Sequence, residues 1–292
     1  MAVVNTNIGA SLAQAALVRN QRALDTAMEQ LSTGSKINSA ADDAAGLAIS
    51  TRMTSQINGL NMAVKNANDA INMVNTAEGA LIEMTTMLQR MRELALQAAN
   101  GTTDTNDRSY LDSEYKALYA EIDRIADNTE WNGRTILDNS ANGNASGFVE
   151  FQVGMDTGQV ITVDFGNFTN VSGSGTFADF VSAGATAGTI SATTTSQAQL
   201  KASAAIGSID TALDAISNQR ATLGGVANRL THSVDNLTNI SVNASASRSA
   251  IMDTDYAAST TDLARASIIA QAGTAMLAQA NQLPQTVLAL LQ

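Results

Sequence analysis

The chain has 292 residues, no Cys, one Trp and one Pro, and a formal net charge of -11 at pH 7. The acidic balance argues against nucleic acid and against membrane surfaces as partners, because both are anionic and are bound through basic patches. The lack of Cys excludes disulfides and thiolate metal sites. Only 4% of the residues are aromatic, so we expect long helices packed side by side on Ala, Leu, Ile and Val rather than a large globular core.

The N-terminal stretch MAVVNTNIGASLAQ lacks the basic start, apolar core and small-residue cleavage site of a secretory signal. No run approaches the roughly 18 apolar residues that a membrane span needs. If the protein leaves the cell, we therefore expect export without a cleaved signal peptide, by a route that recognises something else.

The first helix is predicted over residues 8–31, where Leu17, Leu24 and Leu31 recur one heptad apart. Gly34 follows as a residue that ends helices in the left-handed conformation. The segment KINSAADDAAGLAIS then predicts a new short helix, with a cap from the Asn-Ser pair and two aspartates at the positive end of its dipole.

Two further helices are predicted before the middle of the chain. The longer one ends at Asn100-Gly101 and carries an apolar line with only Glu78 and Arg92 as charged members. Its other positions are Leu60, Val64, Ala67, Ile71, Val74, Leu81, Thr85, Leu88 and Ala95. A third helix follows on Leu111, Tyr115, Leu118, Ile122 and Ile125 and closes near Asn132-Gly133.

The middle of the chain changes character. VEFQVG and VITVDF alternate with the period of two typical of strands, and MDTGQ between them predicts a hairpin loop. Residues 170–196 are rich in Gly, Ser, Thr and Ala, which favours a variable, surface-exposed segment.

Helical pattern returns at about Ala198 and continues to a break at residues 251–255. The last helix, over residues 263–291, is nearly free of charge, with Arg265 as its only charged residue. Stepping by three and four residues along it gives a seam of Leu263, Ala266, Ala270, Gly273, Leu277, Ala280, Pro284, Val287 and Leu291. Such a helix needs a partner in water.

The predicted fold is mainly α: a long antiparallel helical or coiled-coil rod from the N- and C-terminal segments, with a small β-hairpin insert in the middle. A single molecule leaves its apolar ends exposed, so we expect these ends to order on self-association. Head-to-tail contacts that do not close produce a helical filament. The predicted polymerisation seam comprises Leu17, Leu24, Leu31, Leu263, Ala266, Ala270, Gly273, Leu277, Ala280, Val287 and Leu291.

Three separated blocks resemble bacterial flagellin, the subunit of the flagellar filament. The first holds NTNIGASLAQ and LSTGSKINSAADDAAGLAIS, and the second is NTEWNGRTILD at residues 128–138. The third is SRSAIMDTDYAASTTDLARASIIAQAGTAMLAQANQLPQTVLALLQ, which runs to the C-terminus. The resemblance covers nearly the whole chain, in the family's order, and is that of a short form with little or no outer-domain insert.

The resemblance implies a structural subunit that self-polymerises into the extracellular filament, the propeller for swimming motility. It implies an inner-core coiled-coil domain from residues 1–40 and 254–292, and a helical rod domain from residues 41–138 and 198–253. Residues 139–197 are then the β-hairpin and variable insert. The implied partners are other copies of the chain, a type III export chaperone at the C-terminal region, and the filament cap and hook-associated proteins.

The segment LQRMRELALQ at residues 88–97 resembles the stretch of flagellins that the innate receptor TLR5 recognises. Arg90, Leu94 and Glu114 match its main contact positions. The implied receptor and inter-subunit surface is Leu88, Gln89, Arg90, Arg92, Glu93, Leu94, Gln97 and Glu114. The plainer interpretation is that these residues face a neighbouring subunit, and both can hold if only the monomer exposes them.

No catalytic, cofactor or metal constellation stands out, so we expect no enzyme and no cofactor. His232 is the only His, which excludes a two-His zinc motif. The pairs Asp42-Asp43 and Asp253/Asp255 are interpreted as helix caps rather than as metal ligands.

The Ser/Thr-rich insert offers hydroxyls for O-linked glycans, as in some flagellins. An unmodified polar surface explains the composition equally well. The candidate acceptors are Ser172, Ser174, Thr176, Ser182, Thr186, Thr189 and Ser191.

Two other readings stay open at this point. A hook–filament junction protein of the same apparatus shares related end helices, although the match through the middle of the chain argues against it. A non-flagellar coiled-coil surface protein explains the heptads and the acidity, but it does not require both termini to be apolar and poor in charge.

Overall fold

The computed structural model describes residues 7–138, 148–169, 189–192 and 194–290, with the side chains of 195 and 283–290 outside that description. The chain forms two compact units: residues 1–58 with 241–292 (unit 1), and residues 59–240 (unit 2). The long helices α2 (Ala44–Ala99) and α6 (Thr195–Met252) contribute residues to both units.

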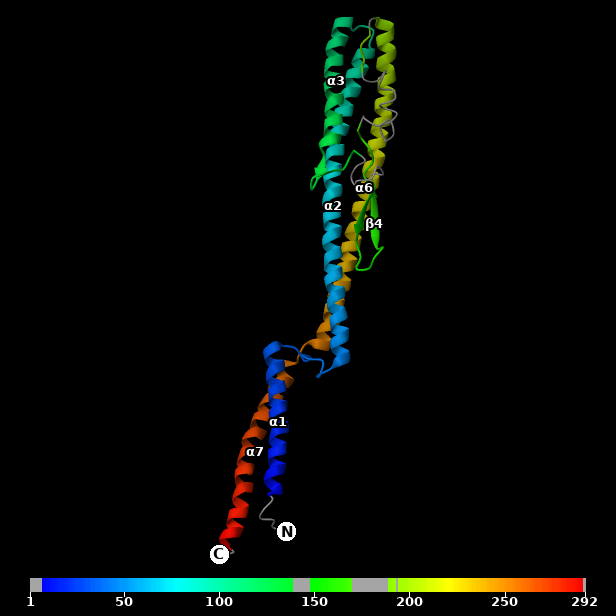
Figure 1. Cartoon of the computed structure of the whole chain (residues 1–292). Coiled ribbons are helices and arrows are strands. Elements are labelled where there is room, and N and C mark those ends of the chain that lie inside the picture. The colour runs from blue at the N-terminus through cyan, green and yellow to red at the C-terminus, as the bar shows by residue number, and fades with distance from the viewer. Residues whose placement is uncertain (1–6, 139–147, 170–188, 193, 291–292) are drawn as a thin grey trace. The chain divides into compact units, whose positions relative to one another are not determined.

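In unit 1, α1 (Ile8–Thr33) and α7 (Tyr256–Leu290) lie side by side (Figure 1). The pairing is antiparallel, because Asn7 before α1 bonds to Ala280 far along α7, whereas Asn20 further along α1 bonds to Ala266 nearer the start of α7. Asn7 caps α1 through its side chain, which accepts a hydrogen bond from the Ala10 amide at 3.0 Å. Gly34 ends α1 at φ 72°, a left-handed conformation that favours glycine.

The segments that follow α1 and precede α7 are paired through their backbones. The Lys36 amide donates to the Met252 carbonyl at 2.6 Å, and the Thr254 amide donates to the Gly34 carbonyl at 3.0 Å. The Asp255 carboxylate then accepts from the Ala257 and Ala258 amides and starts α7. The predicted break before the last helix is therefore a short bridge with a new cap.

Two details of the predicted helices are wrong. The third helix ends at Asn128 rather than near Asn132-Gly133. No separate short helix follows Asn38 and Ser39, because the Asp42 carboxylate accepts from both of their amides and closes a turn there. Asp43 instead caps α2 through hydrogen bonds from the Ala45 and Gly46 amides. From that cap α2 continues without interruption to residue 99.

Unit 2 is built on α2, α6 and α3 (Thr105–Asn128), whose buried apolar side chains form one core. Two small antiparallel hairpins lie between α3 and α6 in the sequence: β1 (Glu130–Trp131) with β2 (Arg134–Thr135), and β3 (Phe148–Gln152) with β4 (Val160–Asp164). In the second hairpin Val149 pairs with Val163 and joins the buried core. Asn66 and Gln219 fasten it to α2 and α6, donating to the Gln152 and Asp164 carbonyls.

The mainly helical fold with a β hairpin in the middle is confirmed, including the predicted strands. Among the described helices, none is both long enough and apolar enough to cross a membrane. The finer division into three domains stays a prediction.

Candidate functional site

The predicted seam residues of α1 and α7 lie between these two helices of the same chain. Those with described side chains are buried or half-buried: Leu17, Leu24, Leu31, Leu263, Ala266, Ala270, Gly273, Leu277 and Ala280. Side-chain amides lock the alignment, since Asn7 Nδ2 donates to the Ala280 carbonyl at 2.8 Å and Asn20 Nδ2 to the Ala266 carbonyl at 2.7 Å. A Cβ on Gly273 would lie 3.1 Å from Leu17 Cδ1, so the close approach favours glycine. The side chain of Val287 and all of Leu291 lie outside the described part, and the role of the seam in polymerisation stays a prediction.

The sequence predicted exposed apolar surface at both ends of the chain, but it did not identify the residues on the outer faces of these helices. Large apolar side chains stand in solvent on both α1 and α7: Ile8, Leu12, Val18, Met28, Ile268, Ile269 and Met276. Their exposed fractions run from 47% for Val18 to 72% for Leu12. The seam takes up one face of each helix, so these outer faces are the apolar surface that unit 1 leaves for another molecule. In the sequence, these outer faces are indicated by apolar residues on more than one face of both helices.

The predicted receptor surface is only partly exposed. Arg90 joins α2 to α3, with Nε donating to Glu114 Oε1 at 2.9 Å and Nη1 donating to Glu93 Oε2 at 3.0 Å. These hydrogen bonds, the one to Glu93 first and then the one to Glu114, raise the pKa of Arg90. Leu88 and Leu94 are buried in the core of unit 2. The exposed members are Gln89, Arg90, Glu93, Gln97 and Glu114, while Arg92 is half-buried and paired with Asp210.

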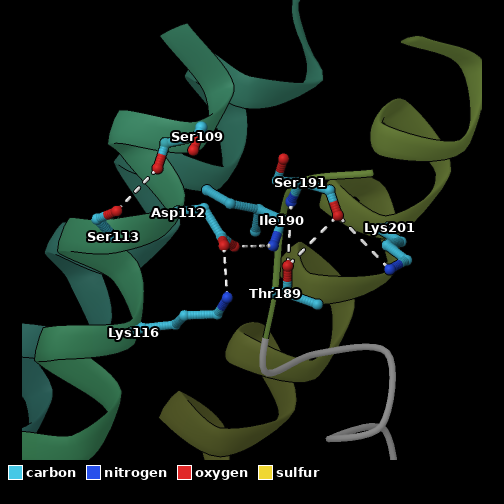
Figure 2. Close-up of polar contacts among 8 residues, drawn as sticks. All are labelled: Ser109, Asp112, Ser113, Lys116, Thr189, Ile190, Ser191 and Lys201. Atoms are coloured by element: carbon cyan, nitrogen blue, oxygen red, sulfur yellow. Dashed lines mark hydrogen bonds and ion pairs between the residues drawn. The ribbon is translucent and has the colours of Figure 1, made fainter. Parts of the chain in front are cut away.

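A buried carboxylate on α3 holds the chain just before α6 (Figure 2). Asp112 is 6% exposed; its Oδ1 accepts from the Ile190 amide at 2.7 Å, and its Oδ2 pairs with Lys116 Nζ at 2.7 Å. Ile190 is fully buried in the core. Burial opposes ionisation, but hydrogen bonds from Lys116, Thr189 and Ile190 outweigh it and lower the pKa of Asp112. One side chain thus fixes two segments that are far apart in the sequence.

Replacing this carboxylate by Asp112→Asn is expected to lower the free energy of unfolding by about 1–2 kcal/mol at pH 7, through loss of the charge-assisted bonds. Because the folded pKa is depressed, the stabilisation is present above the unfolded pKa of about 4 and is lost as the pH falls through the folded value. Urea unfolding midpoints of both proteins at pH 7 and near pH 3 measure the effect. The gap should narrow in acid, and a gap of the same size at both pH values would contradict this role.

Arg108 was not found from the sequence. Its side chain is 1% exposed, and it donates from Nε to the Ala98 carbonyl and from Nη2 to the Asn100 carbonyl, each at 2.9 Å. These carbonyls lie at the C-terminal end of α2, where a cation satisfies orphan acceptors and the negative end of the helix dipole. Its position in the first turn of α3, where a cation is normally disfavoured, is the only signal that the sequence offers.

The remaining candidates are the predicted glycan acceptors, His232 and possible metal ligands. Thr189 hydrogen-bonds to Ser191. Thr189 directly precedes Ile190, whose amide donates to the buried Asp112 carboxylate, so two of the predicted glycan acceptors adjoin that carboxylate. The other five acceptors lie outside the described residues. His232 is exposed on α6. Within the described residues, no group of three or more His, Cys, Asp or Glu side chains is arranged to hold a metal ion.

Residues 4–142 match the family model described as the bacterial flagellin N-terminal helical region, and residues 206–291 match the bacterial flagellin C-terminal helical region. Flagellin from Halalkalibacterium halodurans is 41% identical over 290 residues, which cover 99% of this chain and 100% of the relative. The chain belongs to the bacterial flagellin family. Like its Halalkalibacterium relative, it is a short flagellin. Flagellin A from Vibrio cholerae is 36% identical over an alignment of 380 residues, with 99% of each chain covered.

Among solved structures, a putative flagellar hook-associated protein from Vibrio parahaemolyticus has a similar fold. Its TM-score is 0.56 at 16% identity, covering 72% of this chain and 99% of that one. At that identity the likeness concerns the fold alone.

Membership of the flagellin family makes this chain a structural, non-enzymatic subunit of the extracellular flagellar filament, which serves motility. The reading as a non-flagellar coiled-coil protein is thereby excluded.

Proposed function

We propose that the α1–α7 pairs of many copies form the inner tube of the filament, and that unit 2 forms its outer wall. The observation that carries this proposal is the exposed apolar outer face of α1 and α7. Complete burial of a fully exposed side chain of this size contributes about 1.5–3 kcal/mol, and these half-exposed side chains gain roughly half of that each when helices pack around a common axis.

The distribution of charge supports the same arrangement. Unit 1 holds six Lys and Arg against seven Asp and Glu, whereas unit 2 holds ten against twenty. A nearly neutral unit loses little hydration when it is enclosed, while a strongly acidic one is best left in water. The acidic units of neighbouring copies repel one another, so added salt should favour assembly.

Hydrogen exchange tests this arrangement directly. Backbone amides of α1 and α7 should exchange fast in the monomer and become the most strongly protected amides of the filament. The amides of α2 and α6 inside unit 2 should change far less, because their core is already complete in the monomer. Equal gains of protection in both units would contradict an inner tube made from unit 1.

The export chaperone and the filament cap are proposed as further partners. A chaperone that binds the C-terminal region would cover the apolar faces of α7 before assembly, and a cap would hold arriving subunits at the growing end. The hook-associated proteins would present end helices similar to α1 and α7 at the junctions.

O-linked glycans are proposed for the Ser/Thr-rich insert, and an intact mass above the sequence mass of 30.2 kDa would reveal them.

TLR5 is proposed as a host receptor of the monomer, with Arg90 at the centre of the exposed surface. The variant Arg90→Glu should weaken receptor signalling by about tenfold or more, because it places a third carboxylate beside Glu93 and Glu114. Stability should change little, since exposed ion pairs contribute at most about 1 kcal/mol.

The measurement is a dose–response curve in reporter cells that depend on the receptor. Arg124→Glu is the matched control, because Arg124 is also exposed and also pairs three residues away, with Glu121. Equal potency of the two variants would remove Arg90 from the receptor surface.

A further inference from the structure

Two ion pairs of opposite polarity join α2 to α6 within unit 2, where the helices run alongside each other (Figure 1). Arg92 on α2 pairs with Asp210 on α6, with 2.7 Å between Nε and Oδ1 and 3.5 Å between Nη2 and Oδ2. Glu78 on α2 pairs with Arg220 on α6 at 3.5 Å between Oε1 and Nη2. Thus α2 presents a cation at one level and an anion at another, and α6 presents the opposite charges.

The apolar packing of these helices does not by itself define one alignment. On α2, buried residues recur at intervals of seven: Ala67, Val74, Leu81, Leu88 and Ala95. On α6 they do the same: Ala202, Ile209, Ile216, Leu223, Leu230 and Leu237. A slip of one or two heptads therefore sets apolar residues against apolar residues again.

The charges distinguish the native alignment from these slipped ones. Glu78 and Arg92 stand two heptads apart on α2. A slip of about two heptads in one direction brings Arg92 to the level of Arg220, and in the other direction it brings Glu78 to the level of Asp210. Both slips place like charges together, and a slip of one heptad leaves all four charges without their partners.

Arg220 places a polar atom in the packing between α2 and α6, and burying that atom costs stability. It lies four residues after the buried Ile216 and three before the buried Leu223, on the same side of α6. Its Nε is buried with no hydrogen-bond partner in the described part of the chain. A leucine there would avoid this cost. A polar residue at a heptad position that lowers stability is typical of a residue that selects an alignment.

We propose that Glu78, Arg92, Asp210 and Arg220 form a register key, which selects one alignment of α2 against α6 from the several that the apolar heptads permit. The key acts while the two helices pair, and it holds for this chain whether or not it polymerises. Filament subunits must all have the same shape, so a single alignment also matters for assembly.

The test exploits the absence of Cys from the chain. Spin labels attached through Thr86→Cys and Asn218→Cys, both at exposed positions, report the distance between α2 and α6 by pulsed electron resonance. A slip of two heptads moves one label by roughly 21 Å along the helix axis, so it produces a separate distance. The distances are measured in the full chain after refolding from denaturant.

Exchanging one pair, by Arg92→Asp with Asp210→Arg, keeps both native ion pairs but removes the alternation of charge. A two-heptad slip then joins opposite charges, so we expect a second distance population. Exchanging the other pair as well, by Glu78→Arg with Arg220→Glu, restores the alternation and should restore the single native distance. This matched pair of variants separates alignment from stability.

A single native distance in the one-pair exchange would overturn the proposal, because the pairs would then only stabilise. A second population in the two-pair exchange would overturn it as well. Replacing all four residues with Leu supplies an independent variant that keeps its helices folded: it should show several distances at an unchanged or higher urea midpoint. A single native distance there would also count against the register key.

Discussion

Deletion of residues 280–292 is expected to abolish polymerisation while leaving unit 2 folded. The deletion removes the last part of α7 and the hydrogen bond from Asn7 to the Ala280 carbonyl, so the start of α1 loses its partner. The core of unit 2 contains no residue beyond position 240, and its helices should keep their cooperative unfolding. Circular dichroism during urea titration reports the fold, and light scattering with seeds reports assembly.

The matched control for this deletion is Gln279→Ala, which changes an exposed side chain on the same helix. It should assemble like the parent chain, because the deletion acts through the loss of the apolar end of α7. Normal filaments from the deleted chain would contradict the assignment of α1 and α7 to the inner tube.

Truncation of the buried arginine should have the largest effect on stability. Arg108→Ala removes both hydrogen bonds to the end of α2, leaves the Ala98 and Asn100 carbonyls without that donor, and opens a cavity. Together these losses should lower the free energy of unfolding of unit 2 by about 2–4 kcal/mol. Urea unfolding followed by circular dichroism measures it.

Two comparison variants divide this effect into its parts. Arg108→Met restores the volume without the hydrogen bonds and should recover only part of the loss. Arg124→Ala removes an exposed arginine from the same helix and should cost no more than about 0.5 kcal/mol. If Arg108→Ala were as mild as Arg124→Ala, the buried guanidinium would have no role in ending α2.

Local signals predicted most of the helices and the hairpin. The heptad leucines of α1, the left-handed Gly34 and the Asp255 cap each act within a few residues, so a pattern in the sequence suffices to find them. The β3–β4 hairpin follows in the same way from its alternating residues. The one wrong helix start lies where several residues that can cap a helix stand together. There Asp42 closes a turn, and Asp43 caps α2.

The missed features depend on contacts between distant segments. Asp112 meets Ile190 across 78 positions, and no periodicity connects them. Leu94 lies off the predicted apolar line of α2 and is buried nonetheless, because unit 2 packs more than one face of this helix. A receptor motif read from sequence therefore mixed core residues such as Leu94 with surface residues such as Arg90.

Seeded assembly of the intact chain tests the central claim most directly. Purified monomer at neutral pH, given short filament seeds or a precipitating salt, is followed by light scattering and negative-stain microscopy. Long tubes of uniform diameter are the predicted result, since the exposed faces of α1 and α7 are buried only when many copies pack around one axis. Persistent monomers or short stubs under the same conditions would contradict a filament subunit and favour a junction protein.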